Sequence, residues 1–256
     1  MSINRRQFLT VIGSSAVIVA AGTGGYLATR TPTRALAPWE NAGKAGEDPR
    51  RIALSYAILA PNPHNRQPWL VDLVGDDEIV LYCDLDRRLP ETDPYDRQIL
   101  IGLGCFLEIL RLAAEAGGYR AEIQPFPEGE ATVRLDLRPV ARIRLVHDKS
   151  LTPDPLFASV LNRRSNKEEY DLARPVETDH FRVLETVGNQ RARVKTLSES
   201  DRVKDMRDLT WRAFEIEIET PRTYRESIDL MRIGKAEIEA NPDGIDLGGA
   251  FFETLY

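Results

Sequence analysis

Two arginines, a serine and a lysine stand close together in the stretch RRSNK at residues 163–167. A guanidinium group can bind two oxygens of a phosphate side by side, and a hydroxyl can donate to a third oxygen. The candidate phosphate site is therefore formed by Arg163, Arg164, Ser165 and Lys167. The alternative is a cationic helix end, where positive charge complements the helix dipole.

A second polar stretch, ILAPNPHNRQPWLVDL at residues 58–73, lies between two apolar runs. Its prolines restrict the backbone, and Asn65 and Gln67 each carry both a donor and an acceptor. Such side chains suit the edge of a heterocycle that alternates C=O and N–H groups. Trp69 is expected to anchor this loop in the core. The alternative is a capped turn that only joins a helix to a strand.

Other catalytic chemistry is not indicated by the sequence. The three histidines, His64, His147 and His180, form no HExxH motif and no cluster with cysteine, so no metal site is predicted. The sequence contains no GxSxG nucleophile motif and no Walker loop. No catalytic residue is assigned. His64 is a candidate proton donor, with a packing or loop-capping role as the alternative.

Composition is that of a soluble globular protein, either one large domain or two small lobes. The 256 residues are 42% hydrophobic and 29% charged. The net charge of −6 argues against nonspecific nucleic-acid binding, which needs a basic face. Cys83 and Cys105 each lie in an apolar run and are expected in the core.

The first 37 residues are predicted to be a targeting segment. Arg5 and Arg6 precede a moderately apolar, glycine-containing run, and Ala35-Leu36-Ala37 fits a cleavage site. This pattern resembles a twin-arginine signal, so we expect the twin-arginine translocase as a partner and a periplasmic or extracytoplasmic location after export in the folded state. We expect the chain to contact the membrane only through this segment. The alternative is an uncleaved N-terminal anchor.

Helical and strand-like patterns alternate irregularly along the rest of the chain, which predicts an α+β fold. Helices are expected at residues 47–60, 96–118, 154–162, 178–188 and 200–219. Strands are expected at residues 69–74, 78–85, 119–124, 131–137, 141–147 and 192–197. Helix 96–118 is apolar nearly all round, so it should be buried. Its Gly102 and Gly104 lower helix propensity and predict a close approach by another backbone.

Read together, these motifs resemble the nitroreductase family. APNPHNRQPW at residues 60–69 is similar to the family's helix that ends in AP and is followed by N-x-QPW. RRSNKEEYD at 163–171 resembles its RRS-x-(R/K) phosphate motif, and residues 97–119 resemble its central interface helix. The order of the motifs is inverted relative to an ordinary member. That order, with the export signal, resembles the fused two-lobed Acg-type subgroup.

The resemblance implies one FMN bound between two pseudo-symmetric lobes, an intramolecular pseudo-dimer. The phosphate side would be Arg163, Arg164, Ser165 and Lys167. The loop reaching the ribityl chain and ring would be Pro61, Asn62, Pro63 and Asn65. The expected domains are the signal at 1–37, a first lobe at 38–149 and an incomplete second lobe at 150–256.

A weak internal repeat supports two lobes, because residues 217–229 can be laid over the loop with Pro221 on Pro61. The second copy would be a degenerate loop. Since nothing after it matches helix 96–118, the chain is expected to be C-terminally truncated, with that helix exposing an apolar face.

Two functions follow from the resemblance. The first is an FMN-dependent oxidoreductase that transfers hydride or electrons to a small-molecule acceptor such as a nitroaromatic or a quinone. The second is a protein that binds or sequesters flavin without turnover, because nicotinamide donors are scarce outside the cytoplasm.

Overall fold

The computed structural model describes residues 31–166, 169–186 and 193–248. The fold is α+β, as predicted. The chain divides into two compact units, one formed by residues 1–163 together with 226–256 and the other by residues 164–225. The predicted signal residues 1–30 and Lys167 lie outside the described residues. The domain limits expected from the sequence, after residues 37 and 149, stay predictions.

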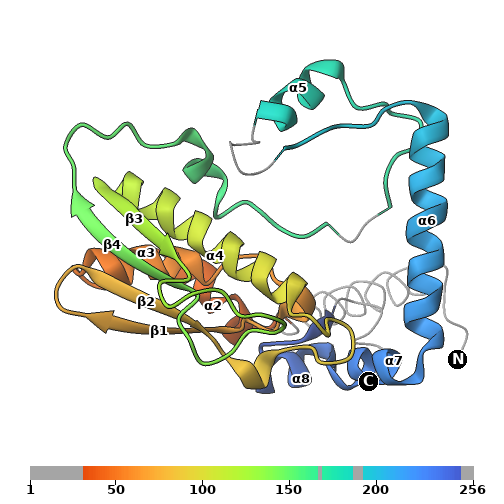
Figure 1. The fold of residues 1–256 in the computed structure, drawn as a ribbon, viewed down its shortest axis with the longest axis horizontal. Helices are drawn as coiled ribbons and strands as arrows, with labels where there is room; N and C mark the ends of the chain where they lie inside the picture. Colours follow the sequence, from red (N-terminus) through yellow and green to blue (C-terminus); the bar gives the residue numbers. More distant parts are fainter. Residues whose placement is uncertain (1–30, 167–168, 187–192, 249–256) are drawn as a thin grey trace, which may run out of the picture. The chain divides into compact units, whose positions relative to one another are not determined.

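The larger unit is built on a four-stranded antiparallel sheet (Figure 1). Its strands are β1 (Trp69–Val74), β2 (Glu78–Cys83), β3 (Tyr119–Pro125) and β4 (Ala141–His147), in the order β1-β2-β4-β3. The first two strands form a hairpin in which Trp69 pairs with Cys83. The last two pair over their full length, from Tyr119 with His147 to Pro125 with Ala141.

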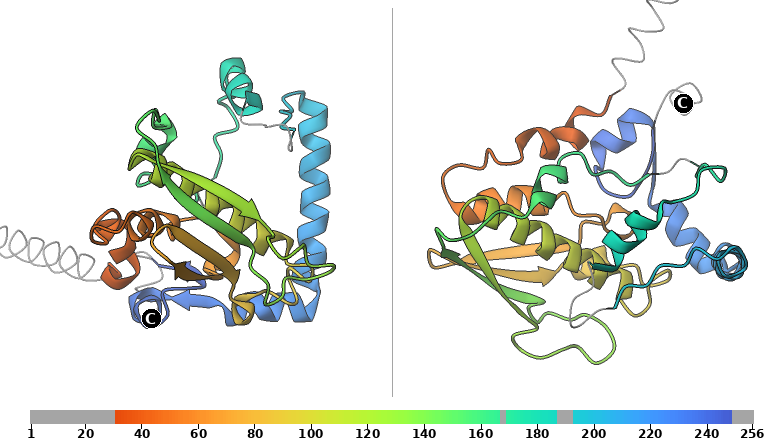
Figure 2. Two further views of the ribbon diagram at one scale, coloured as in Figure 1. Left: turned by 60° about the vertical axis from the view of Figure 1, so that its left-hand side comes forward. Right: turned by 90° about the horizontal axis from the view of Figure 1, so that it is seen from above.

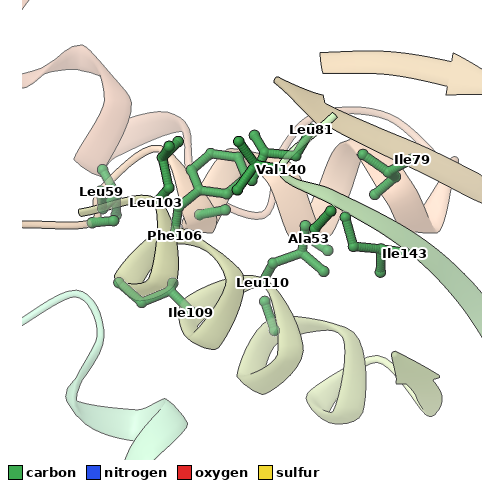
Figure 3. Close-up of a cluster of buried hydrophobic side chains, with 14 of the residues drawn as sticks. Ala53, Leu59, Ile79, Leu81, Leu103, Phe106, Ile109, Leu110, Val140 and Ile143 are labelled. Carbon is green, nitrogen blue, oxygen red and sulfur yellow. The ribbon is translucent and has the colours of Figure 1, made fainter. Parts of the chain in front are cut away.

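Two helices, α3 (Pro49–Ala57) and α4 (Arg97–Ala116), pack together and share the core with the sheet. Nine residues of α4 are buried, and most of them recur at helical spacing, which gives the helix one apolar face. Figure 3 shows side chains of this face, among them Leu103, Phe106 and Leu110, meeting residues of the sheet and of α3. The opposite face is exposed, with Ile101 67% accessible. The prediction of a buried helix therefore holds for one face.

The last described part of the chain returns to the larger unit. It comprises the end of α7 (Pro221–Asp229), β5 (Met231–Ile233), α8 (Gly234–Ala240) and β6 (Ile245–Leu247). The strands β5 and β6 pair in parallel. At the start of the described chain, α2 (Thr33–Asn41) contains the predicted cleavage site, and the backbone N–H of Arg34 donates to Glu239 at 3.0 Å.

The smaller unit contains α5 (Thr178–Thr186) and α6 (Ser200–Glu219). Figure 2 shows α6 as one continuous helix. None of the residues of α6 is buried. Within the described part of the whole chain, no helix is long and apolar enough to cross a membrane.

Four predicted elements differ from the structure. Residues 131–137 form no strand, and the backbone N–H of Leu135 donates to the Asp96 carboxylate at 2.9 Å rather than to a neighbouring strand. Residues 193–197, the described part of the strand expected at 192–197, are irregular. Residues 221–228 form α7 rather than a degenerate loop, since Pro221 fits a first helical turn. The expected helix at 154–162 is reduced to the 3₁₀ turn η3 (Pro155–Ser159).

The cysteines are free and differ in exposure. Cys83 is buried, as predicted, and burial raises its pKa to about 12. Cys105 is only partly buried. Its pKa is raised mainly by burial, with the positive charge of Arg163 acting in the opposite direction.

Candidate functional site

The loop between α3 and β1 lies directly against α4. Gly102 is the point of approach: a Cβ there would lie 2.9 Å from Asn62 Cβ and 3.3 Å from Pro63 Cδ. Glycine is therefore required for the loop to come this close, as the sequence predicted. The prediction is wrong for Gly104, because no atom lies within 4 Å of a Cβ placed at that residue.

The backbone of this loop is unusual over four residues. His64, Asn65 and Gln67 have positive φ angles of 47°, 49° and 51°. The left-handed region is uncommon for residues other than glycine, although histidine and asparagine tolerate it better than most. Asn62 braces the loop from inside: its Oδ1 accepts the Gln67 N–H at 2.7 Å, and its Nδ2 donates to the Ala60 carbonyl at 3.1 Å.

The polar side chains of the loop point at residues 242–244. Gln67 Nε2 donates to the Pro242 carbonyl at 2.8 Å, and Asn65 Nδ2 donates to the same carbonyl at 3.4 Å. The Gly244 N–H in turn donates to the Asn65 carbonyl at 3.2 Å. The side-chain amides that the sequence suggested for a heterocycle thus donate within the chain in this structure. Trp69 anchors the loop as predicted, with its ring 5.2 Å from that of Phe106.

An ion-pair cluster surrounds Asp243. Its Oδ2 lies 2.7 Å from Arg66 Nη1 and 3.3 Å from Arg87 Nη1, and its Oδ1 lies 3.5 Å from Arg232 Nη2. Burial lowers the pKa of Arg66, and the charge of Asp243 opposes that shift. Sequence reasoning missed this cluster, because Arg66 and Asp243 are 177 residues apart. The sequence PDG at residues 242–244 is typical of a turn, but such a signal does not identify a distant partner.

The structure brings one residue of the phosphate motif to this loop. Arg163 Nη2 donates to the Leu59 carbonyl at 2.7 Å, two residues before Pro61. The Arg163 backbone N–H donates to the Ser159 carbonyl at 2.9 Å, so a turn that follows η3 sets its position. The sequence left open which arginine faces inward, and Arg163 is the half-buried one.

The remaining residues of the motif belong to the smaller unit. Arg164 and Ser165 are exposed there. Arg164 and Ser165 supply a guanidinium and a hydroxyl, which are donor types that suit phosphate oxygens. Among the described residues, no group of three histidine, cysteine or acidic side chains could hold a metal ion.

Comparison with known proteins gives partial matches. No protein-family model matches the chain. It is 38% identical over 77 residues to "Putative NAD(P)H nitroreductase acg" of Mycobacterium tuberculosis. The matched segment covers 30% of this chain and 23% of that protein. It is 29% identical over 120 residues to "Putative NAD(P)H nitroreductase Rv3131" of the same organism. This second matched segment covers 47% of this chain and 33% of that protein. These matches support the nitroreductase family.

The nitroreductase relationship rests on part of each chain, since the matches span between 23% and 33% of the relatives' length. A crystal structure of a putative NADH oxidase from Clostridium acetobutylicum covers 50% of this chain and 92% of its own. It is 16% identical, with a TM-score of 0.34, which is too low to assign a fold.

Proposed function

We propose that this chain is a nitroreductase-like oxidoreductase whose cofactor is FMN. One observation carries the proposal: the Arg163 guanidinium donates to the Leu59 carbonyl at 2.7 Å. This hydrogen bond links the first residue of the phosphate motif to the segment just before the loop at residues 61–68, although Arg163 and Leu59 are 104 residues apart in sequence. The phosphate motif and this loop are the two segments that resemble nitroreductase motifs, and the similarity to nitroreductase-named relatives supports the same assignment.

The chain's own residues would bind and orient the cofactor. Arg164 and Ser165, with Lys167 beyond the described residues, would hold the phosphate. Pro61, Asn62, Pro63 and Asn65 would present a rigid surface to the ribityl chain and the ring. When bound, FMN supplies the hydride or electron transfer to the acceptor, and the protein supplies binding and orientation. The proposed acceptors are nitroaromatics or quinones.

The phosphate assignment is tested with Arg164→Ala. Losing a charge-assisted contact to a dianion should weaken FMN binding by about 2–4 kcal/mol, which is at least about thirtyfold in Kd. Arg174→Ala is the matched control, because Arg174 is an exposed arginine of the same unit outside the motif. Titration followed by flavin fluorescence measures both. Equal affinity in the two variants would remove Arg164 from the site.

Flavin storage without turnover is the second candidate. It is favoured by the loop itself, where the amides of Asn65 and Gln67 donate to the Pro242 carbonyl. The two functions differ in one measurement. NADPH should bleach the flavin of an oxidoreductase, and a nitroaromatic should restore the colour. A flavin reduced only by dithionite would indicate storage.

A further inference from the structure

Three residues of the loop, His64, Asn65 and Gln67, are held at positive φ. Such a conformation is unfavourable for residues other than glycine and persists only where surrounding contacts impose it. Two of the contacts that impose it come from nearby in the sequence or from α4: the Asn62 brace on the Gln67 N–H and the close approach at Gly102. The others come from residues 242–244, at the far end of the chain.

We call residues 242–244 the clasp, because they make the distant contacts with the loop. The Pro242 carbonyl accepts from Gln67, and the Gly244 N–H donates to the Asn65 carbonyl. These two bonds lie on either side of Asp243. The side chain of Asp243 contacts the loop itself through Arg66, at 2.7 Å.

Asp243 also compensates positive charge beside the loop. Arg66, Arg87 and Arg232 converge on its carboxylate. The side chains of Arg66 and Asp243 are only 13% and 19% exposed, so solvent screens this pair weakly. Arg87 Nη1 also donates to the Arg66 carbonyl at 3.0 Å, so Arg87 contacts the loop backbone as well as Asp243. Without the carboxylate, like charges would repel one another beside the loop.

We propose that Asp243 is a positioning residue that holds residues 62–67 in the shape that receives the flavin. The proposal rests on the proposed function for the identity of the ligand. It assigns the C-terminal segment a part in the site that neither motif predicts: the segment fixes the loop, and the loop presents its surface to the cofactor.

The test compares Asp243→Asn with Asp136→Asn in the full chain. Asp136 is the control for loss of a carboxylate charge, because it makes a more exposed ion pair with Arg138, at 2.8 Å, that does not involve the loop. Hydrogen exchange without flavin should be about tenfold faster at the amides of residues 65–67 in Asp243→Asn, with no change in the exchange of α4. FMN Kd should rise about tenfold. Asp243→Glu should restore part of both, because it restores the charge.

Arg87→Gln is the second variant, used if Asp243→Asn fails to fold. It removes the bond to the Arg66 carbonyl and one contact to Asp243, and it should speed exchange in the same amides. Loop exchange and FMN affinity equal to those of Asp136→Asn would overturn the proposal, as would faster exchange throughout α4. If the unaltered chain binds no FMN, the proposed function fails, and the loop amides still decide whether Asp243 holds this segment.

Discussion

Two helices of the same length behave in opposite ways. Helix α4 and helix α6 each span 20 residues. Nine residues of α4 are buried, whereas none of α6 is. Helix formation and burial are therefore separate outcomes of the sequence: the first needs good helix formers, and the second needs apolar residues gathered on one face.

The spacing of apolar residues explains the difference. In α4 the buried residues 99, 102, 103, 106, 109, 110 and 113 repeat every three or four positions, and charged residues such as Glu108 and Arg111 lie opposite. In α6 the large apolar residues are spread round the helix and are interleaved with charges; they are Val203, Met206, Leu209, Trp211, Phe214, Ile216 and Ile218. Only the first pattern gives a continuous face that can join a core.

The largest expected effect comes from truncating one phenylalanine in each helix. Phe106 is fully buried and packs on Trp69 at 5.2 Å between ring centres, so Phe106→Ala should cost about 3–5 kcal/mol of unfolding free energy. Phe214 is 47% exposed, and Phe214→Ala should cost less than about 1 kcal/mol. Urea unfolding followed by circular dichroism measures both. Similar losses of unfolding free energy in the two variants would mean that Phe214 is packed in a core as Phe106 is, which would contradict the exposure of α6.

The two helices were predicted well, as were the strands β1 and β4, whose expected and observed bounds are the same. Helix 96–118 was expected and Arg97–Ala116 is observed, and residues 200–219 match α6 at both ends. Long helices carry their own periodic signal. Among the elements that the sequence missed, β5, α8 and β6 are only three to seven residues long and depend on contacts with distant parts of the chain.

The candidate site divides in the same way. The loop at residues 61–68 and the close approach at Gly102 could be predicted, because proline, asparagine and glycine constrain the backbone locally. The clasp could not be, because Asp243 and Arg66 are 177 residues apart in sequence and only the tertiary fold brings them together. The direction of the Asn65 and Gln67 amides was missed for the same reason: the Pro242 carbonyl that accepts from them is a distant backbone atom.

A smaller difference is expected at the helix starts. The Asp93 carboxylate, in a side chain that is almost fully buried, accepts the N–H groups of Arg97 and Ile99, both at 2.9 Å. Asp93→Ala should cost about 1–3 kcal/mol, because it leaves buried donors without an acceptor. At the start of α6, Glu199 makes no side-chain cap bond. Glu199→Ser should therefore stabilise α6 by about 0.5–1 kcal/mol.

Thermal unfolding of the two cap variants, read at 222 nm, separates these effects. A loss on Glu199→Ser as large as that on Asp93→Ala would contradict the comparison, because it would mean that the wild-type glutamate already stabilises the start of α6. Asp93→Asn is the control for volume, since it keeps one acceptor oxygen and should recover part of the loss.

The smallest expected effect changes sign within α4. Glycine to alanine inside a helix gains about 0.5–1 kcal/mol when the new methyl group meets nothing. Gly104→Ala should show that gain, because no atom lies within 4 Å of its Cβ position. At Gly102 the methyl group would lie 2.9 Å from Asn62 Cβ, and crowding of this kind costs about 1–3 kcal/mol. Because the propensity gain offsets part of the cost of crowding, Gly102→Ala should range from neutral to destabilising by up to about 2 kcal/mol.

Differential scanning calorimetry measures the stabilities of the two variants, and hydrogen exchange at the Gln67 amide reports whether the loop has moved. A stabilised Gly102→Ala with an undisturbed Gln67 amide would show that the loop yields without cost and that α4 does not fix its position.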